Sequence, residues 1–479
     1  MTPTTAPAAV PTQVLPSADR VGRVETHGID VIPASERHGH ARELFTVWAA
    51  PNTSYLAMVV GAALILMGLN LWQALAVIVV GNLFCGVMGL VAVSGPASGT
   101  PSEVTMRAMF GVRGNRVNIA IAGWLVCVAY LALNWAAASL TAFSLAERAG
   151  IHATTGVKIV IILAIAAATL AIGVYGHATI VKLYLPLTVV LAVMFVVFAI
   201  FVLGQADWSY QPESALNGVE LWATISAGVA LIASGPLSYS NSSDFARYLP
   251  RTTSPFAVAG WTALGSAVPS VLLSALGALA ATAVDMSDPE AGFESILPSW
   301  FVPIFLIAVI VATIANNATT AYSSGLTLQA MGVRLRRSRS VLLDGTIGVA
   351  LTLYALLVSN FLDSVSNLMQ LILALTGPVM AIYASDILLR RNRYDGAELS
   401  DETSGSPFWY TGGVNWAGVI AMVMGATSAV LCVNAPVFTG PIANAMGGVD
   451  LSLPAGMLVA AAVYVTLTRR HRASIGAAA

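Results

Sequence analysis

Apolar runs long enough to cross a membrane recur along nearly the whole chain, and this feature most restricts the possible folds. A run of about 20 apolar residues crosses the roughly 30 Å hydrocarbon core of a bilayer as a helix. Only 9% of the 479 residues are charged, whereas about 25% are charged in an ordinary soluble domain. The sequence therefore predicts an all-α integral membrane protein. Its twelve expected transmembrane helices are 44–68, 71–94, 116–146, 157–175, 178–204, 220–242, 256–283, 300–330, 341–360, 362–389, 414–434 and 451–468.

The N-terminal part of the chain differs in composition from the rest. Residues 1–42 are rich in Pro, Ala, Thr and charge and have no apolar run of their own, so we expect a disordered cytoplasmic tail. A secretory signal is not expected, because the first apolar run starts too late and is too long. The transporter domain is expected to span 43–470. Cys85, Cys127 and Cys432 lie inside apolar runs, which favours buried thiols over metal ligands.

The distribution of basic residues tests the expected topology. Lys and Arg are retained on the cytoplasmic side of short loops, and twelve spans place both termini on one side. If that side is the cytoplasm, 20 of the 22 basic residues lie inside, with Arg148 and Lys158 the exceptions. The outer loops at 205–220 and 284–298 carry acidic residues and no basic ones. The sequence thus predicts a multi-pass protein of the cell membrane with both termini in the cytoplasm.

Two of the expected spans are interrupted near their middles by residues typical of turns. The first interruption is "WAAPNTSY" (Trp48 to Tyr55), and the second, in the sixth span, is "IASGPLSYSNSSDFARYLPR" (Ile232 to Arg251). Pro51 and the pair Gly235-Pro236 weaken the backbone hydrogen-bond ladder. In lipid each freed polar group costs several kcal/mol unless protein, water or a ligand satisfies it.

The spacing of the interruptions indicates an internal repeat. The two broken spans, the first and the sixth, are five positions apart, and an odd separation inverts the second unit relative to the first. Paired broken helices at matching positions are typical of transporters built from inverted repeats, with the binding site at the bilayer midplane. Simple kinks are the alternative, and Gly377-Pro378 in the tenth span is interpreted as one. The repeats are expected at about 43–204 and 220–389, followed by two extra helices at about 414–468.

The chain lacks the motifs of a membrane enzyme or an ATP-driven pump. Its six histidines pair with no carboxylate or nucleophile on a shared membrane face, and no Gly-x-Ser-x-Gly, His-Glu-x-x-His or phosphate-binding Walker loop occurs. By the expected boundaries, no charged residue lies near the centre of a span, and Asp244, Asp344 and Asp386 lie at cytoplasmic ends. Ionisable groups within the membrane usually mark proton relays or charged substrates. A neutral, hydrogen-bonding substrate is therefore expected.

Amide and hydroxyl side chains supply the polar groups at mid-membrane. Asn316 and Asn317 would be costly facing lipid, and the alternative to a ligand role is interhelical hydrogen bonding, worth about 0.6–2 kcal/mol per contact. Tyr130 and Asn134 are four residues apart and share one helix face. The tyrosine could stack on a flat ring while the amide binds its edge, although aromatic packing is the commoner role. The candidate substrate-binding residues are Asn52, Tyr130, Asn134, Gly235, Ser238, Tyr239, Asn316 and Asn317.

Three motifs carry a resemblance to a known family. They are "SNSSDFARYLP" after span six, "NNATTAYSSGLTLQAMG" in span eight, and "ASDILLRRNRYDGAEL" leading to "GGVNWAGVIAMVMG" after span ten. With these motifs the chain resembles the nucleobase:cation symporter family, in its purine and cytosine permease branch, over roughly 40–470. The resemblance implies a five-plus-five inverted repeat (LeuT-like) with broken helices one and six and two extra C-terminal helices.

The resemblance also implies where a substrate binds. Family members hold a planar base between spans one, three, six and eight. Tyr130 occupies the span-three position where many relatives have Trp, and Asn134 supplies the amide four residues later. The span-eight amide corresponds best to Asn317. A span-six aromatic of relatives is replaced near Leu237-Ser238, where Tyr239 is the candidate substitute.

The coupling cation is left open between Na⁺ and H⁺. In sodium-coupled relatives, backbone carbonyls of broken span one and hydroxyls of span eight bind the ion, which here corresponds to the region of Trp48 and Pro51 and to Ala312, Thr313 and Asn316. Thr313 is the only hydroxyl in that part of span eight, so sodium would have few side-chain oxygens. Proton coupling, on the other hand, lacks a buried carboxylate in the sequence interpretation. No cofactor and no structural or catalytic metal is expected.

The functional hypothesis is a secondary active transporter that imports a neutral nucleobase, cytosine or a purine, by cation symport and alternating access. Hydantoin, allantoin, uracil, or a vitamin such as thiamine or pyridoxine would fit nearly as well. A facilitative channel or a membrane enzyme is the second alternative. The expected partners are the heterocycle and the lipid bilayer, not nucleic acid, and the oligomeric state stays open between monomer and oligomer. Asn317→Ala is predicted to abolish uptake.

Overall fold

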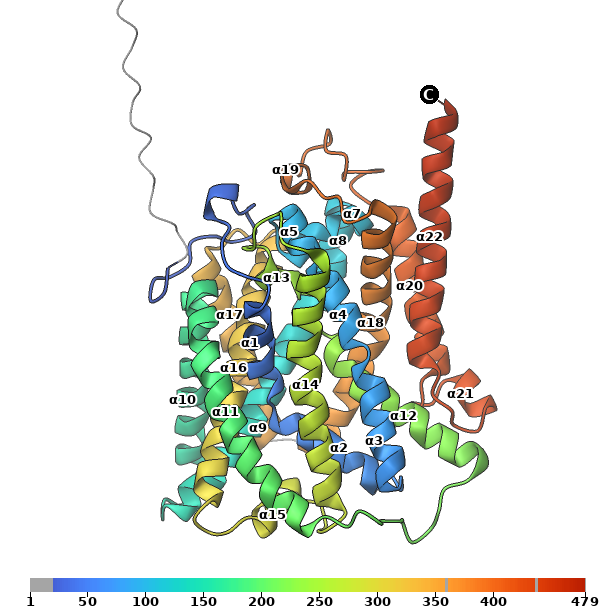
Figure 1. Ribbon diagram of the computed structural model, residues 1–479. Coiled ribbons are helices and arrows are strands. Elements are labelled where there is room, and N and C mark those ends of the chain that lie inside the picture. Colours follow the sequence, from blue (N-terminus) through green and yellow to red (C-terminus); the bar gives the residue numbers. More distant parts are fainter. Residues whose placement is uncertain (1–19, 358–360, 436–437, 479) are drawn as a thin grey trace, which may run out of the picture.

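Helices make up nearly all of the described chain. The computed structural model describes residues 20–357, 361–435 and 438–478, and within these ranges the β structure is limited to two isolated bridges. Figure 1 shows a bundle of long helices, with the N-terminal segment 20–42 and the end of the last helix at the same end of the bundle. This end is termed the basic end. The short helices α5, α7, α8 and α13 lie toward it, and α15 lies at the opposite end.

The long helices follow the expected segments closely. In chain order they are α1 (Glu43–Asn52), α2 (Tyr55–Leu66), α3 (Leu71–Asn82), α4 (Cys85–Ala92), α9 (Val126–Arg148), α10 (Thr155–Tyr175), α11 (His177–Gln205), α12 (Gly218–Leu237), α14 (Pro255–Ala281), α16 (Val302–Ala330), α17 (Arg337–Leu357), α18 (Phe361–Arg390), α20 (Trp416–Cys432) and α22 (Ser452–Ala478). The short elements are η1 (Ala34–Glu36), α5 (Ser94–Ser98), α6 (Ser102–Thr105), α7 (Arg107–Phe110), α8 (Val112–Ile119), η2 (Ala120–Leu125), α13 (Ser243–Ala246), α15 (Pro289–Ile296), α19 (Gly396–Ser400) and α21 (Pro441–Ala445).

The protein is a multi-pass membrane protein. Within the described ranges, nine helical segments are long and apolar enough to cross a membrane, and the bent pair α1 and α2 makes a tenth. The expected tenth and eleventh spans correspond to α18 and to α20, whose 17 residues are fewer than that criterion requires. The count of twelve therefore stays a prediction, as do the bounds of the two repeats.

The break in the first span is confirmed. Helix α1 continues through Pro51 to Asn52, and α2 begins at Tyr55 with a bend of 59° between the two. The Ser54 side chain accepts a hydrogen bond from the backbone N–H of Leu56 and so caps α2. The turn thus falls just after the proline.

The sixth span breaks later than the sequence suggests. Helix α12 does not unwind at Gly235-Pro236 but continues to Leu237, and turns over 238–242 precede the single turn of α13. Proline in a last helical turn removes only one backbone hydrogen bond, and its fixed φ suits a helix. The N–H of Ser238 still donates to the carbonyl of Ser234 at 3.1 Å. The prediction that Gly235-Pro236 unwinds the helix was therefore wrong in position.

Contacts between spans repeat with an offset of five. Span one (α1, α2) packs against span seven (α14), and span six (α12) packs against span two (α3, α4). Span one also contacts span five (α11), as span six contacts span ten (α18), and span three (α9) contacts span nine (α17), as span eight (α16) contacts span four (α10). Exchanging every span for its counterpart five positions away converts one contact of each pair into the other. An inverted five-plus-five repeat produces this pattern, with α20 and α22 packed outside it.

Part of the N-terminal segment is ordered, contrary to the expectation for 1–42. Residues 1–19 lie outside the described residues, but 20–42 pack against the basic end with Glu25 and Ile32 buried. The Arg37 guanidinium donates to the carbonyls of Ile32 and Pro96, both at 2.9 Å. The packing is held by polar partners on distant parts of the chain, and composition alone does not show them.

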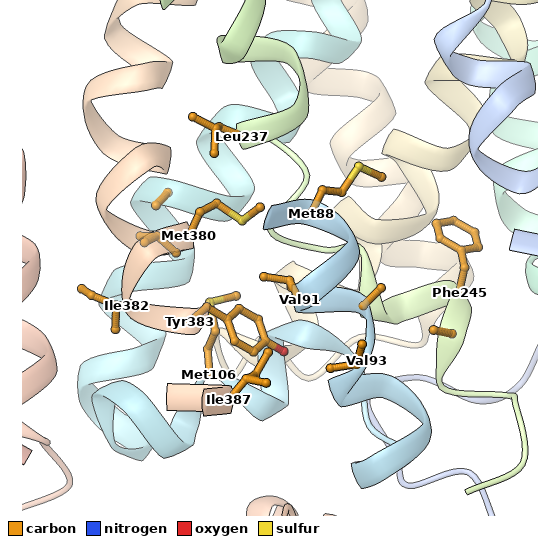
Figure 2. Close-up of a cluster of buried hydrophobic side chains, with 14 of the residues drawn as sticks. Met88, Val91, Val93, Met106, Leu237, Phe245, Met380, Ile382, Tyr383 and Ile387 are labelled. Atoms are coloured by element: carbon orange, nitrogen blue, oxygen red, sulfur yellow. The ribbon is translucent and has the colours of Figure 1, made fainter. Parts of the chain in front are cut away.

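A buried apolar cluster fixes the end of α12. Leu237 lies in it with Met88 and Val91 of α4 and Met380 of α18 (Figure 2). The hydroxyl groups of Tyr383 on α18 and Ser94 on α5 are hydrogen-bonded at 2.8 Å at the edge of this cluster. Leu237 therefore points into protein, away from the space between the broken spans.

Candidate functional site

A cavity of about 110 Å³ lies between the two broken spans and α9 and α16. It is smaller than the roughly 300–1,000 Å³ of pockets for drug-sized ligands, which suits one small ring system. Of the eight predicted substrate-binding residues, seven line the cavity, and Asn317 does not. The seven are Asn52, Tyr130, Asn134, Gly235, Ser238, Tyr239 and Asn316.

Three amides form a connected chain behind and beside the cavity. The Asn134 amide nitrogen donates to the side-chain oxygens of Asn317 at 2.9 Å and Asn316 at 3.2 Å. Asn317 in turn donates to the carbonyl of Leu131 at 2.9 Å and is fully buried. The structure thus places Asn316 at the cavity and Asn317 behind it, between α16 and α9.

Asn316 also joins the two halves of the site. Its amide nitrogen donates to the carbonyl of Pro51 at 2.7 Å, in the last turn of α1. The side-chain amide of Asn52 donates to the carbonyl of Trp48 at 2.8 Å. The backbone at the first break is therefore satisfied by amide side chains, as a polar break in a membrane requires.

Two tyrosine rings stand on the cavity wall. Tyr130 lies on α9, and Tyr239 lies in the turn after α12, where its ring packs edge-on against Trp48 with 5.0 Å between ring centroids. Leu237, by contrast, is buried in the apolar cluster. Tyr239 is thus the aromatic residue that the broken sixth span presents to the cavity.

Two polar atoms of the cavity wall lack protein partners. The hydroxyl of Tyr130 and the side-chain oxygen of Asn241 are buried and form no hydrogen bond within the described residues. Buried polar atoms in proteins are normally hydrogen-bonded, so both are available to a polar ligand. Asn241 was not among the predicted residues. The expected helix over 220–242 did not indicate that Asn241 lies in a turn that lines the cavity. The polar run "SNSSD" beside a helix break is the signal that could have found it.

The residues predicted for the coupling ion do not form a cluster of free oxygens. The carbonyls of Trp48 and Pro51 already accept amide hydrogen bonds. The Thr313 hydroxyl donates to its own helix at Val309, 2.8 Å away, and Ala312 packs in an apolar cluster. The described residues also contain no group of three or more His, Cys, Asp or Glu side chains that could hold a metal ion.

Buried carboxylates are present, contrary to the sequence interpretation. Glu103, Asp244, Asp344 and Asp386 are each at most 2% exposed. Asp344 accepts hydrogen bonds from Trp124 and Ser324, both at 2.7 Å. These acids lie outside the cavity lining. Burial raises the pKa of Glu103 well above its ordinary range and also raises the pKa of Asp244.

The sequence matches one family profile over most of its length. The profile, described as "Permease for cytosine/purines, uracil, thiamine, allantoin", covers residues 31–456. YxlA of Bacillus subtilis, a protein assigned by name to the purine-cytosine permeases, is 29% identical over 460 residues, which cover 93% of this chain and 96% of YxlA. The purine-cytosine permease FcyB of Emericella nidulans is 26% identical over 295 residues, or 57% of this chain and 56% of FcyB.

Solved transporter structures share the fold. Mhp1, a nucleobase-cation-symport-1 family transporter in a closed conformation with bromovinylhydantoin bound, superposes with a TM-score of 0.74 at 17% identity, covering 95% of each chain. A Na⁺-coupled sialic acid symporter superposes with a TM-score of 0.57 at 12% identity, covering 89% of this chain and 91% of the symporter. The expected five-plus-five transporter fold is therefore confirmed.

Proposed function

The chain belongs to the family of permeases for cytosine and purines, uracil, thiamine and allantoin, and we propose that it imports a neutral nucleobase, cytosine or a purine, by cation symport. Family membership makes it a permease and not an enzyme. The relatives named for purine and cytosine transport support the choice of substrate. Hydantoin, allantoin, uracil, thiamine and pyridoxine remain alternatives within the same fold.

The neutral, amide-rich cavity is the observation that carries this proposal. Within the described residues, no Asp, Glu, Lys, Arg or His side chain lines it. Asn134, Asn316 and Asn241 present amide donors and acceptors, which match the alternating donors and acceptors on the edge of a nucleobase. Tyr130 and Tyr239 supply aromatic surface for the faces of the ring. A charged substrate would leave its charge uncompensated in this cavity, which makes thiamine, a thiazolium cation, the least favoured of the alternatives.

The orientation follows from the basic residues. We infer that the basic end faces the cytoplasm and that the protein lies in the cell membrane, because Lys and Arg are retained on the inner side of short loops. The two predicted outer loops carry acidic residues and no basic ones. Substrate then enters from the opposite end, and transport requires the packing at the basic end to open.

Uptake into proteoliposomes tests the proposal. We expect the purified protein to accumulate labelled cytosine or a purine against its gradient when a cation gradient is imposed, whereas a channel would only equilibrate it. Competition with unlabelled adenine, uracil, allantoin, hydantoin, thiamine and pyridoxine ranks the alternatives. Thermal melting gives an independent readout, because a ligand at 100 times its dissociation constant stabilises the folded state by about 2.7 kcal/mol.

A variant pair makes this test specific to the cavity. Asn316→Ala should abolish accumulation, and Asn444→Ala, at an exposed asparagine of α21 outside the cavity lining, should leave it unchanged. If none of the tested heterocycles is accumulated or stabilises the wild-type protein, the proposed substrate class is refuted.

A further inference from the structure

Two carboxyl groups meet at the basic end, apart from the substrate cavity. Glu103 lies on α6, between spans two and three, and Asp244 lies on α13, just after the broken sixth span. They are 2% and 0% exposed. The backbone N–H of Ser102, the residue before Glu103, donates to Asp244 at 2.9 Å, so the two buried carboxyl groups belong to one polar cluster and their charges interact.

The remaining hydrogen bonds of the pair are unequal. The carboxylate of Asp244 accepts from the backbone N–H of Ser102 at 2.9 Å and from the Ser323 hydroxyl at 2.7 Å. Glu103 accepts one bond from the Thr327 hydroxyl at 3.1 Å through Oε1, while its Oε2 is buried and has no donor among the described residues. Asp244 therefore accepts more hydrogen bonds from the protein than Glu103 does.

Two buried carboxyl groups in one cluster favour a proton on one of them. Two adjacent buried carboxylates cannot both be ionised, so the pair titrates as a unit and holds one proton over a wide pH range. Asp244 accepts two hydrogen bonds and Glu103 only one, so the negative charge is better stabilised on Asp244 and we place the proton on Glu103.

The surrounding charges do not neutralise the pair. The charge of Arg247 acts on Asp244, but its guanidinium donates to the carbonyl of Gly28 at 2.7 Å, to Tyr322 at 3.0 Å and to Glu25 at 3.3 Å. Its charge is thus shared with a second buried carboxylate. The other titratable groups around the pair are Cys127 on α9, Tyr322 on α16, Asp344 on α17 and Tyr383 on α18.

The pair spans elements that must separate during transport. Asp244 follows the broken span six, while Ser323 and Thr327, which hold the two carboxyl groups, lie on span eight. Rocking of one helix bundle against the other opens the contact between the end of span six and span eight to water at the basic end. Hydrated and apart, each carboxyl group returns to an ordinary pKa of about 4 and loses the shared proton.

The pair also lies next to the substrate cavity. Asn241 lines the cavity, and its carbonyl accepts the backbone N–H of Asp244 at 3.0 Å. Cys127 lines the same cavity, and its thiol lies within electrostatic range of both carboxyl groups. Substrate binding in the cavity and closure of the contact between span six and span eight can therefore influence each other through the turn at 238–242.

We propose that the Glu103 and Asp244 pair is the proton-binding site of the symporter, loaded while the basic end is closed and emptied into the cytoplasm when it opens. This proposal rests on the proposed function, since a coupling proton presupposes cation symport. It names H⁺ as the coupling cation and assigns its site outside the substrate cavity.

The first test needs no substrate. Infrared spectroscopy of the purified full-length protein should show, at neutral pH, the C=O stretch of a protonated carboxyl group. This signal should disappear in Glu103→Gln and persist in the matched control Glu398→Gln, at an exposed glutamate of α19. An unchanged signal in a folded, monodisperse Glu103→Gln protein would overturn the proposal. Asp244→Asn serves as a second variant. Loss of the signal in Asp244→Asn would support the proposal, as its loss in Glu103→Gln does.

The second test uses transport driven by a pH gradient. One unit of gradient supports up to about tenfold accumulation per proton, and we expect wild type and Glu398→Gln to accumulate labelled cytosine. Glu103→Gln should lose driven accumulation and retain cytosine counterflow, because Gln mimics the protonated acid. Accumulation by Glu103→Gln at the wild-type level, or driven by Na⁺ alone in wild type, would refute the assignment. Absence of cytosine counterflow in wild type would count against the proposed function, while the infrared signal still decides the proton site.

Discussion

Asn316 and Asn317 are neighbours in sequence, yet their amides serve different surfaces. Successive residues of an α-helix point about 100° apart, so one amide reaches the cavity and Pro51 while the other reaches Asn134 and Leu131. Sequence reasoning could find the pair, because two adjacent amides in an apolar run need partners. It could not tell which of the two faces the ligand, because an error of one residue in the helix rotation exchanges them.

The two alanine variants should therefore fail in different ways. Asn316→Ala removes an amide from the cavity and leaves the carbonyl of Pro51 without its donor, so nucleobase affinity should fall by about tenfold to a hundredfold. Asn317→Ala removes the hydrogen bonds that Asn317 makes with the Asn134 amide and the carbonyl of Leu131 in the interior, which should lower stability by about 1–3 kcal/mol. Equilibrium binding of labelled base and thermal melting in detergent separate the effects. A greater affinity loss in Asn317→Ala than in Asn316→Ala would restore the direct role first predicted for Asn317.

Two tyrosine hydroxyls allow a similarly sharp comparison. In the part of the chain that the structure describes, the Tyr130 hydroxyl has no hydrogen-bond partner, so Tyr130→Phe should change stability by less than about 0.5 kcal/mol. If that hydroxyl binds substrate, affinity should fall by up to about tenfold. The Tyr184 hydroxyl donates to the carbonyl of Ala315 at 2.5 Å outside the cavity lining, so Tyr184→Phe should destabilise the protein by about 1 kcal/mol and spare affinity. Equal affinities for Tyr130→Phe and wild type would exclude a hydrogen bond from this hydroxyl to substrate.

At the scale of elements, the spans themselves were predicted well and their breaks less accurately. Length and apolarity are local properties, so segments such as 256–283 match the helices found, here α14 (Pro255–Ala281). Pro51 and Pro236 mark the breaks, but each lies in the last turn of a helix that ends one residue later. A proline removes a bond to the preceding turn, whereas the break forms where following residues cap or turn the chain. The order of 20–42 was missed because its partners, Arg247 and Arg337, are more than 200 residues away.

Close packing of span one against span seven depends on glycines. A Cβ atom on Gly61 of α2 would collide with the backbone of Ser274, and one on Gly277 of α14 would collide with the backbone of Met58. Backbone atoms cannot move aside as a flexible side chain can. The two helices can therefore approach this closely only if both positions lack side chains, as small residues at membrane helix interfaces allow.

Gly277→Ala should destabilise the protein even though alanine favours helices. In an unobstructed helix this change stabilises by about 0.5–1 kcal/mol, and Gly260 on the same helix has open space at its Cβ position. Gly260→Ala should therefore leave stability unchanged or raise it slightly, while Gly277→Ala should lower it by about 1–3 kcal/mol through overpacking. Melting temperatures of both variants in one detergent give the comparison. Matching temperatures would show that α2 and α14 can move apart at little cost.

At the scale of the whole molecule, one carboxylate ties the N-terminal segment to several spans. Glu25 is buried between Arg247, at 3.3 Å, and Arg337, at 3.7 Å. It also accepts hydrogen bonds from the hydroxyls of Tyr248 at 2.6 Å and Tyr322 at 3.1 Å. Arg247 and Tyr248 follow α13, Tyr322 lies on α16 and Arg337 begins α17, so this contact ties the segment to three parts of the bundle at the basic end.

Glu25→Gln should loosen the basic end. Removing one partner of a buried ion pair typically costs about 3–5 kcal/mol, because the remaining charge stays buried, and here two guanidinium groups would lose their carboxylate. We expect faster hydrogen exchange in 20–42 and in α13, measured by mass spectrometry in detergent. Glu43→Gln, at a carboxylate that is 42% exposed in the first turn of α1, is the matched control. Unchanged exchange in Glu25→Gln would show that the segment does not hold this end closed.

The Glu103 and Asp244 pair makes the closed protein sensitive to pH, and the sign follows from linkage. Burial, with the charge of Asp244 adding to it, raises the pKa of Glu103 in the closed state, whereas in water the pKa is about 4.3. Between the two values the closed state holds one more proton, so its stability is complete below the ordinary pKa and falls as pH rises through the raised one. The loss is up to about 1.4 kcal/mol per pH unit. As pH rises, the melting temperatures of wild type and Glu398→Gln should therefore decline. The curve of Glu103→Gln should stay flatter, because its amide needs no proton. Parallel curves for all three proteins would exclude the shared proton.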